Sequence, residues 1–192
     1  RAAAKREQAA ASYRIRESDA KAERGNKFMF SFLKKKAENT GQVTCLKAYT
    51  SGRVIPVREV PDPVFSEGLL GDGIAIWPEE DEILAPADGV VTVAPEDSRH
   101  ACGLRLSNGI ELLLHVGLDT VSMNGKGFEL KVSPGQKVRM GQPLLHFDRQ
   151  KIKAAGLCDV AVMVVAENEK GISIQFHTGM DASSKKTVIA EF

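Results

Sequence analysis

Two of the four histidines in this sequence, His100 and His115, stand at the two ends of a segment that predicts a β-hairpin. The dipeptide Asn108-Gly109 between them is typical of a two-residue type I′ turn. If these two residues form the loop, His115 lies opposite Cys102, and His100 is its diagonal neighbour on the same face, with Cα atoms roughly 7–8 Å apart. A loop of three residues would shift the register by one and place the two rings on opposite faces. The sequence therefore predicts a pair of facing imidazoles, provided that the turn has two residues.

Two facing imidazoles can bind a metal ion, act as acid and base, or carry a phosphoryl group. No third side chain has a metal-like spacing, which disfavours a metal site built by this chain alone. His115 precedes a turn that contains Gly117 and Asp119, and a backbone carbonyl near Gly117 could hold the Nδ1 proton of the ring. Nε2 would then be unprotonated and nucleophilic, because imidazole has a pKa of about 6.5. The other two histidines, His146 and His177, have no such neighbours and are expected to be surface or core residues.

The elements that must position this pair are predicted to be short strands from Val43 onward. Apolar runs separated by turn residues predict strands at 74–76, 89–93, 110–115, 137–138, 144–147, 160–165 and 172–176. One helix is predicted at 149–155, with Asp148 as its N-cap and Gly156 at its end. This pattern is typical of an all-β sandwich or barrel with short helices. The sequence has no βαβ alternation, no G-x-G-x-x-G motif and no P-loop, which disfavours a nucleotide-binding fold.

Composition divides the chain into a basic N-terminal extension and an acidic body. The first 36 residues hold 11 Lys and Arg against four Asp and Glu, a charge of +7, whereas the rest holds 15 against 21, a charge of −6. An acidic body disfavours nucleic acid as a partner and favours a basic protein. Hydrophobic residues make up 43% of the chain, yet no apolar run reaches the ~18 residues of a transmembrane helix, and no signal-peptide core is visible.

The extension, residues 1–42, is predicted to be a helical or disordered tether ahead of one domain at 43–192. Within it, residues 28–36 combine three Phe, one Leu and three Lys, which suits a short helix in weak contact with an anionic membrane surface. A helix docked on the domain is the alternative. Three widely spaced cysteines indicate neither disulfides nor a cysteine metal site, which fits a reducing cytoplasm. We therefore expect a cytoplasmic protein, with the inner face of the membrane as a further location.

Seven segments of the body form a recognisable set that includes both histidine motifs: 60–76, 85–89, 100–101, 111–121, 124–128, 135–138 and 141–144. Together they resemble the glucose-type enzyme IIA, the EIIA type 1 domain of the bacterial phosphoenolpyruvate-dependent sugar phosphotransferase system. The resemblance covers roughly residues 43–192, with both histidine motifs at the family spacing. The resemblance implies an antiparallel β-sandwich of the barrel-sandwich-hybrid type with a shallow active-site depression.

The resemblance also implies roles for the two histidines. His115 would receive a phosphoryl group from the histidine-containing phosphocarrier protein HPr and pass it to a cysteine of enzyme IIB, during sugar uptake through the IIB/IIC permease. His100 would hydrogen-bond the phosphoryl group and be needed for onward transfer. The phosphate would be carried covalently, so no cofactor or metal is expected, although the two rings could share a zinc ion with a partner protein. Regulatory protein targets are left open.

Further residues match family positions around the histidines. Asp62 and Asp119 correspond to acidic positions that meet arginines of the phosphocarrier. Val64 and Phe65 correspond to the apolar rim of the site. An acidic body, an apolar rim and two imidazoles together suit docking by a basic carrier protein.

Two other residues, Ser98 and Gly117, are expected to support the site, and the departures from the family pattern concern Ser98, Glu96 and Cys102. Ser98, which stands where the family often has Thr, keeps the hydroxyl, and Gly117 lets the chain turn beside the nucleophile. Glu96 occupies a rim position where an aromatic residue is common, so partner affinity is expected to differ. Cys102 would lie beside the histidines as a small, at least partly buried residue whose oxidation could disturb the site.

Two alternative functions have weaker support. A biotinyl- or lipoyl-carrier domain has a similar sandwich, but it needs an exposed lysine at a hairpin tip, and Lys126 between two glycines is the only near candidate. A metallopeptidase-like hydrolase could use two histidines, but a third ligand and a base are missing. The sequence selects neither a sugar nor an oligomeric state. A natural start at Met29 would resemble a free-standing enzyme IIA, whereas the segment 1–27 resembles a tether to fused IIB and IIC domains.

Overall fold

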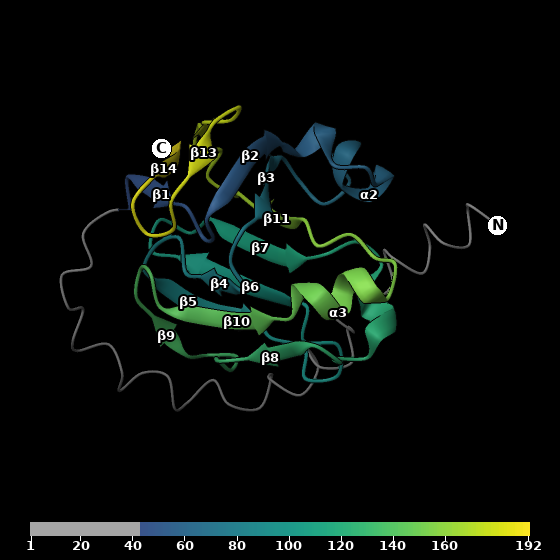
Figure 1. Cartoon of the computed structure of the whole chain (residues 1–192). Helices are drawn as coiled ribbons and strands as arrows, with labels where there is room; N and C mark the ends of the chain where they lie inside the picture. The colour runs from purple at the N-terminus through teal and green to yellow at the C-terminus, as the bar shows by residue number, and fades with distance from the viewer. Residues whose placement is uncertain (1–42) are drawn as a thin grey trace. The chain divides into compact units, whose positions relative to one another are not determined.

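The structure is a computed structural model and describes residues 43–192 (Figure 1). The predictions for residues 1–42, a tether with a membrane-surface segment at 28–36, lie outside these residues and stay predictions. The elements, labelled as in Figure 1, are β1 (Cys45–Lys47), β2 (Gly52–Pro56), η2 (Val57–Glu59), α2 (Pro63–Ser66), β3 (Gly73–Pro78), β4 (Glu82–Leu84), β5 (Gly89–Val93), β6 (Ala101–Leu106), β7 (Glu111–Val116), η3 (Thr120–Met123), β8 (Phe128–Leu130), β9 (Lys137–Val138), β10 (Pro143–Phe147), α3 (Arg149–Ala154), β11 (Ala161–Glu167), β12 (Gln175–Phe176), β13 (Asp181–Ala182) and β14 (Val188–Glu191).

Three antiparallel sheets make up this part of the chain. The largest has eight strands in the order β13-β2-β3-β11-β7-β6-β5-β9, and two smaller sheets have the orders β4-β10-β8 and β1-β14-β12. All strand pairings among residues 43–192 are antiparallel. Figure 1 shows β10 and β8 of the second sheet below β7 of the large sheet in this view. The all-β antiparallel sandwich predicted from the sequence is confirmed.

Side chains alternate along β7, so this strand of the large sheet contributes to two apolar clusters, one on each face of the sheet. Leu112 and Leu114 belong to the main core, together with Leu145 and Phe147 of β10. Leu113, between them in sequence, packs instead against a second cluster on the other face of the sheet. His115 shares the face of Leu113. The predicted division of this strand into a core face and a histidine face is therefore confirmed.

The predicted helix and most predicted strands are present. The side chain of Asp148 accepts a hydrogen bond from the Lys151 N–H at 2.9 Å and so caps α3, and Gly156 follows the helix with φ 71°. No helix among residues 43–192 is long and apolar enough to cross a membrane. The strands β1, β2, β4, β8, β13 and β14 are additional to those predicted, and each has only two to five residues, too few for an alternating pattern to indicate a strand.

The strand predicted at 172–176 is wrong over most of its length, since only Gln175–Phe176 are extended and paired. The reason lies in Asn168, whose side chain accepts a hydrogen bond from the Ile172 N–H at 2.9 Å and donates one to the Ile172 carbonyl at 2.8 Å. Both backbone groups of Ile172 are therefore bonded to a side chain and take no part in a strand ladder.

The predicted two-residue hairpin turn is also wrong. The Leu106 N–H donates to the Ile110 carbonyl at 2.8 Å, so the loop has three residues, 107–109. The Asn108 side chain accepts from the Ile110 N–H, and Gly109 has φ 97°, as in the three-residue loop whose last residue is left-handed. His115 consequently lies opposite Ala101, one residue away from the predicted partner.

Candidate active site

The site is built around His115, at the end of β7 in the middle of the large sheet. Antiparallel register places Val162 of β11 on one side of it and Ala101 of β6 on the other. Phe65 of α2 covers the ring, with ring centroids 5.2 Å apart. Only 7% of His115 is exposed, so its imidazole lies among apolar neighbours with one small residue, Ala101, beside it.

The second imidazole, His100, meets the first edge-on. The two ring centroids are 4.7 Å apart, and the ring planes cross at 89°. Phe128 of β8 also lies near His100, with its ring centroid 6.5 Å from that of His100. Only 6% of His100 is exposed. The predicted pairing of the two histidines is therefore present, although the prediction required a hairpin loop of two residues and the loop has three.

The rings meet because His100 does not belong to the regular strand. Strand β6 begins one residue later, at Ala101, and His100 lies at a bend after Arg99, whose φ is 54°. The Val116 N–H still donates to the His100 carbonyl at 2.8 Å, so the backbone remains attached to β7. Strict alternation of faces applies only to extended residues, and at His100 it no longer sets the direction of the side chain.

Burial keeps both imidazoles neutral. Desolvation lowers the pKa of His115 well below its ordinary value of 6.5, the neighbouring His100 lowers it further, and a hydrogen bond with the Gly117 backbone acts in the opposite direction. Desolvation also lowers the pKa of His100, opposed by a hydrogen bond with the Ser98 backbone. The Nδ1 atoms of both rings are buried. Nε2 is therefore the candidate nitrogen for attack on a group brought by a partner.

The turn after His115 requires glycine at its first position. Gly117 has φ 78°, and a Cβ atom there would lie 2.2 Å from Cγ2 of Thr120 and 2.8 Å from the Cys158 carbonyl. The Gly117 N–H donates to the Val160 carbonyl at 2.8 Å, and the Thr120 hydroxyl donates to the Val116 carbonyl at 2.6 Å. The turn is thus fixed against the segment that leads into β11.

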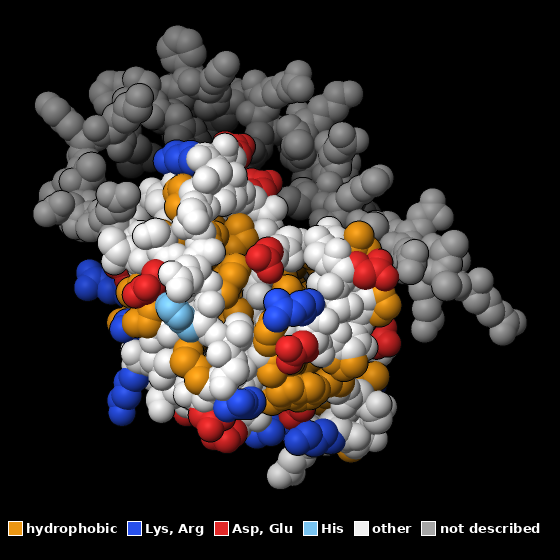
Figure 2. All heavy atoms as spheres, turned by 90° about the horizontal axis from the view of Figure 1, so that it is seen from above, with side chains coloured by type: hydrophobic (Ala, Val, Ile, Leu, Met, Phe, Trp, Pro, Cys, Tyr) orange, Lys and Arg blue, Asp and Glu red, His pale blue; other side chains and the backbone are white. Residues whose placement is uncertain are grey.

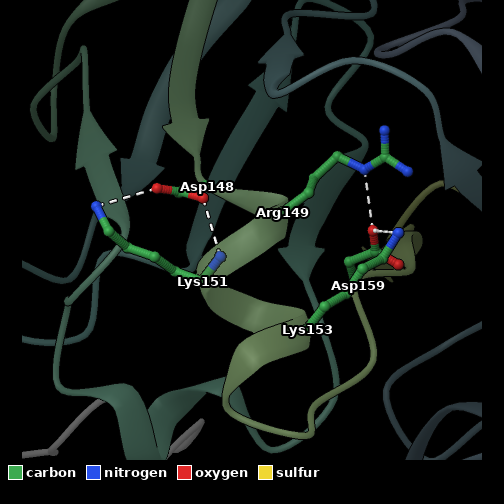
Figure 3. A network of polar contacts seen from close by, with 5 residues as sticks. All are labelled: Asp148, Arg149, Lys151, Lys153 and Asp159. Carbon is green, nitrogen blue, oxygen red and sulfur yellow. Dashed lines mark hydrogen bonds and ion pairs between the residues drawn. The ribbon is translucent and has the colours of Figure 1, made fainter.

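The segment 158–160, which leads into β11, contains the buried carboxylate of Asp159, which forms ion pairs with α3. Figure 3 shows Arg149 and Lys153 of α3 converging on Asp159, with N···O distances of 2.9 and 3.3 Å. The Asp159 side chain is only 8% exposed, so two cations compensate a charge that would be costly alone. The flanking carbonyls of Cys158 and Val160 are the ones that hold the turn after His115.

Comparison with known proteins decides the family. Residues 44–171 match the family described as phosphoenolpyruvate-dependent sugar phosphotransferase system, EIIA 1. The chain belongs to this EIIA family. The resemblance seen in the sequence is therefore confirmed, and the carrier-domain and hydrolase alternatives gain no support from the match.

Relatives of this EIIA domain occur both alone and within longer proteins. The chain is 42% identical over 149 residues to the mannose-specific EIIBCA component of Corynebacterium glutamicum, a match that covers 78% of this chain and only 22% of that protein. It is 37% identical over 161 residues to the glucose-specific EIIA component of Bacillus anthracis, covering 84% of this chain and 96% of that one. The chain thus spans about a fifth of the length of the longer relatives.

A solved structure has the same fold. The glucose permease IIA from Mycoplasma capricolum superposes with a TM-score of 0.68 at 32% sequence identity, over 81% of this chain and 98% of that one. The β-sandwich of this EIIA domain is therefore the family fold.

The other predicted site residues of the EIIA domain take varied positions. Asp62 caps α2, because its Oδ1 accepts the Val64 N–H at 2.7 Å, and Val64 is half-buried. Asp119 is exposed at φ 58° in the turn after His115. Ser98 reaches His100 through its backbone, so the hydroxyl is not what the contact uses. The roles proposed for these residues stay predictions.

Cys102 lies elsewhere than predicted. The corrected register pairs it with Leu114, and its side chain is fully buried in the main core, where burial raises the pKa of the thiol to about 12. It therefore faces away from the histidines. The predicted surface or core positions of the remaining histidines agree with the structure, since His146 is half-buried on β10 and His177 lies 3.5 Å from Glu191.

Sequence reasoning missed Phe128 and Arg99 as neighbours of the site. Phe128 stands in a motif that supported the resemblance, but nothing in the local pattern of β8 shows that its ring reaches His100. Arg99 precedes His100 directly, and a non-glycine residue with positive φ has no reliable sequence signal.

The histidines lie outside the clefts that the structure describes. A cleft of about 640 Å³ is lined by residues 79–82, by α3 and by residues 184–185, and a smaller one of about 250 Å³ lies near Arg99 and Glu129. Among residues 43–192, no group of three His, Cys, Asp or Glu side chains could hold a metal ion.

Buried neutral histidines make the stability of the EIIA domain depend on pH. The folded pKa values lie below 6.5, so the free energy of unfolding is independent of these groups above pH 6.5 and falls as the pH drops further, because the unfolded chain takes up protons that the folded rings do not. Each unit of difference between the folded and unfolded pKa contributes about 1.4 kcal/mol. Urea unfolding between pH 8 and pH 5 measures this slope.

The variant His115→Gln should flatten that slope between pH 6.5 and pH 5. The wild-type chain is the comparison, and a slope in His115→Gln that equals the wild-type slope would contradict the buried neutral pair.

Proposed function

We propose that this chain is a phosphoryl carrier, which accepts phosphate from HPr on His115 and passes it to a cysteine of enzyme IIB. The observation that carries the proposal is the buried pair of neutral imidazoles, with both Nδ1 atoms enclosed and ring centroids 4.7 Å apart. Membership in the EIIA family supports it. The names of two relatives combine EIIB, EIIC and EIIA in one component, which supports IIB as the acceptor.

Each step of the proposed relay forms one bond to phosphorus and breaks another. The Nε2 lone pair of neutral His115 attacks the phosphoryl group on HPr, while the bond to the donor imidazole breaks and its electron pair returns to the donor nitrogen. His115 keeps its other ring proton, which the Gly117 backbone holds. A IIB thiolate then attacks phosphorus, and His115 leaves as neutral imidazole. No resident metal is needed for either step.

His100 is proposed to stabilise the phosphoryl group on its neighbour. A phosphoryl group carries about two negative charges near neutral pH, and these favour a ring that donates a hydrogen bond and can take up a proton. His100 is held in place by Ser98, His115 and Phe128. Its fixed position means that little reorganisation is needed when the charge arrives.

A protein, and not a small molecule, is the donor that suits this site. Exposed apolar side chains lie near the site elements, with Leu69 after α2 60% exposed and Val121 in η3 49% exposed. We propose that these residues form the apolar rim together with the half-buried Val64, whereas the predicted rim residue Phe65 is only 4% exposed and packs against His115. Figure 2 views the face over β13, β2 and α2, where hydrophobic side chains lie between acidic and basic ones. Asp62 and Asp119 would meet the arginines of a basic carrier.

Reconstitution tests the proposed donor. Phosphoenolpyruvate, enzyme I and HPr together should add one phosphate to the wild-type chain, because the relay needs each carrier in turn. Omission of HPr should abolish labelling, and radiolabelled phosphoenolpyruvate measures it. Full labelling without HPr would show that the donor is wrong. Relatives named for mannose and for glucose match this chain about equally, so the assay should use IIB domains for both sugars.

A further inference from the structure

The direction of the His100 side chain is unexpected from the strand that follows it. Ala101 lies opposite His115 and shares its face, whereas Cys102 points into the main core. If the strand extended one residue further back, His100 would point into the core as well, because successive side chains alternate. Its ring instead lies 4.7 Å from that of His115. Something before Ala101 must redirect the chain.

A closed turn immediately before His100 redirects the chain. The Arg99 N–H donates to the Pro95 carbonyl at 2.9 Å, and the Arg99 Nε donates to the Glu96 carbonyl at 2.8 Å. Arg99 itself has φ 54°, in the left-handed region that residues other than glycine, Asn and Asp rarely adopt. Such a conformation persists only where its surroundings hold it, and here both a backbone and a side-chain hydrogen bond do so.

The turn at 95–99 also packs against the loop that leads to Phe128. A Cβ atom on Gly125 would lie 2.7 Å from the Asp97 carbonyl and 3.5 Å from Cδ of Arg99, so the absence of a side chain there lets the turn approach. The Ser98 backbone, within the turn, raises the pKa of His100 against the larger effect of burial. The turn at 95–99 therefore sets the path of the chain that enters His100.

We infer that Arg99 is a positioning residue for His100: its left-handed backbone conformation directs the His100 ring toward His115. Where it concerns phosphoryl transfer, the inference rests on the proposed function, in which the His100 ring assists transfer from His115 to IIB and must be aligned with it. It concerns backbone conformation and makes no use of the charge of Arg99.

A graded set of variants separates backbone conformation from charge. Arg99→Gly removes the guanidinium and also removes the conformational energy that positive φ costs a residue with a side chain. Arg99→Ala removes the guanidinium but keeps this energy cost, and Arg99→Val increases it through the branched side chain. Lys185→Val is the matched control, because Lys185 is exposed and has φ 65° but lines the cleft beside α3 and not the histidine site.

Two readouts are compared: the ring-to-ring NOE between His100 and His115 without phosphate, and the rate of transfer from phosphorylated His115 to IIB. Arg99→Gly should keep the NOE and transfer within about threefold of wild type, whereas Arg99→Val should lose the NOE and transfer about tenfold more slowly. Arg99→Ala should lie between them. Lys185→Val should match wild type in both readouts.

Equal rates for Arg99→Gly and Arg99→Val would overturn the inference, and so would equal losses in Arg99→Val and Lys185→Val. If wild-type protein accepted no phosphate, the proposed function would fail. The NOE in the four variants would still decide whether Arg99 positions the ring.

Discussion

His115→Ala should accept no phosphate from HPr, a loss of the whole labelling signal. The variant removes the proposed acceptor, Nε2 of His115, and the remaining His100 has its Nδ1 buried and its ring edge-on to the vacated position. The body should remain folded, because the removed ring contacts α2 and does not belong to the main core. Labelling by phosphoenolpyruvate, enzyme I and HPr measures the effect.

The matched control is His177→Ala. This histidine is partly exposed and lies beside Glu191 in the small sheet β1-β14-β12, so its removal should leave labelling unchanged. Full labelling of His115→Ala would show that another group is the acceptor. Equal losses in both variants would indicate a general effect on folding.

His100→Gln should accept phosphate but pass it to IIB about 10²-fold more slowly or worse. Glutamine can donate a hydrogen bond to a phosphoryl oxygen, so arrival on His115 is preserved. It cannot take up a proton, and its flexible amide lacks the edge-on contact that fixes the imidazole. Single-turnover transfer from the phosphorylated domain to IIB measures the second step separately from the first.

His100→Ala provides the comparison for this prediction, because it removes the hydrogen bond as well. It should be slower than His100→Gln in both steps. Wild-type onward transfer by His100→Gln would exclude His100 from the mechanism, since the variant retains no titratable group at that position.

Much of the architecture could be predicted from the sequence because it depends on local patterns. The helix α3 follows from its cap at Asp148 and the glycine at 156, and the two faces of β7 follow from alternation. The importance of the two histidines also followed, first from their positions around a hairpin and then from the family motifs. These features need no knowledge of distant contacts.

The register and the surroundings of the site could not be predicted in the same way. Asn108-Gly109 suits two loop lengths, and the choice between them depends on the hydrogen bond between Leu106 and Ile110. A two-residue hairpin register predicts that the two histidines meet, but this register is wrong, and the turn at Arg99 brings them together instead. Phe128 follows a loop that lies against the turn at 95–99 at Gly125, a contact that no local sequence pattern indicates.

The position of the phosphate is the most direct test that His115 is the carrier. Cleavage after Arg99, Arg105 and Lys126 separates the two histidines into different tryptic peptides, 100–105 and 106–126. After labelling through HPr and digestion at alkaline pH, where phosphohistidine survives, mass spectrometry should find one acid-labile phosphate, on peptide 106–126 at His115. Phosphate on peptide 100–105, or an acid-stable phosphate on a serine or threonine, would contradict the account.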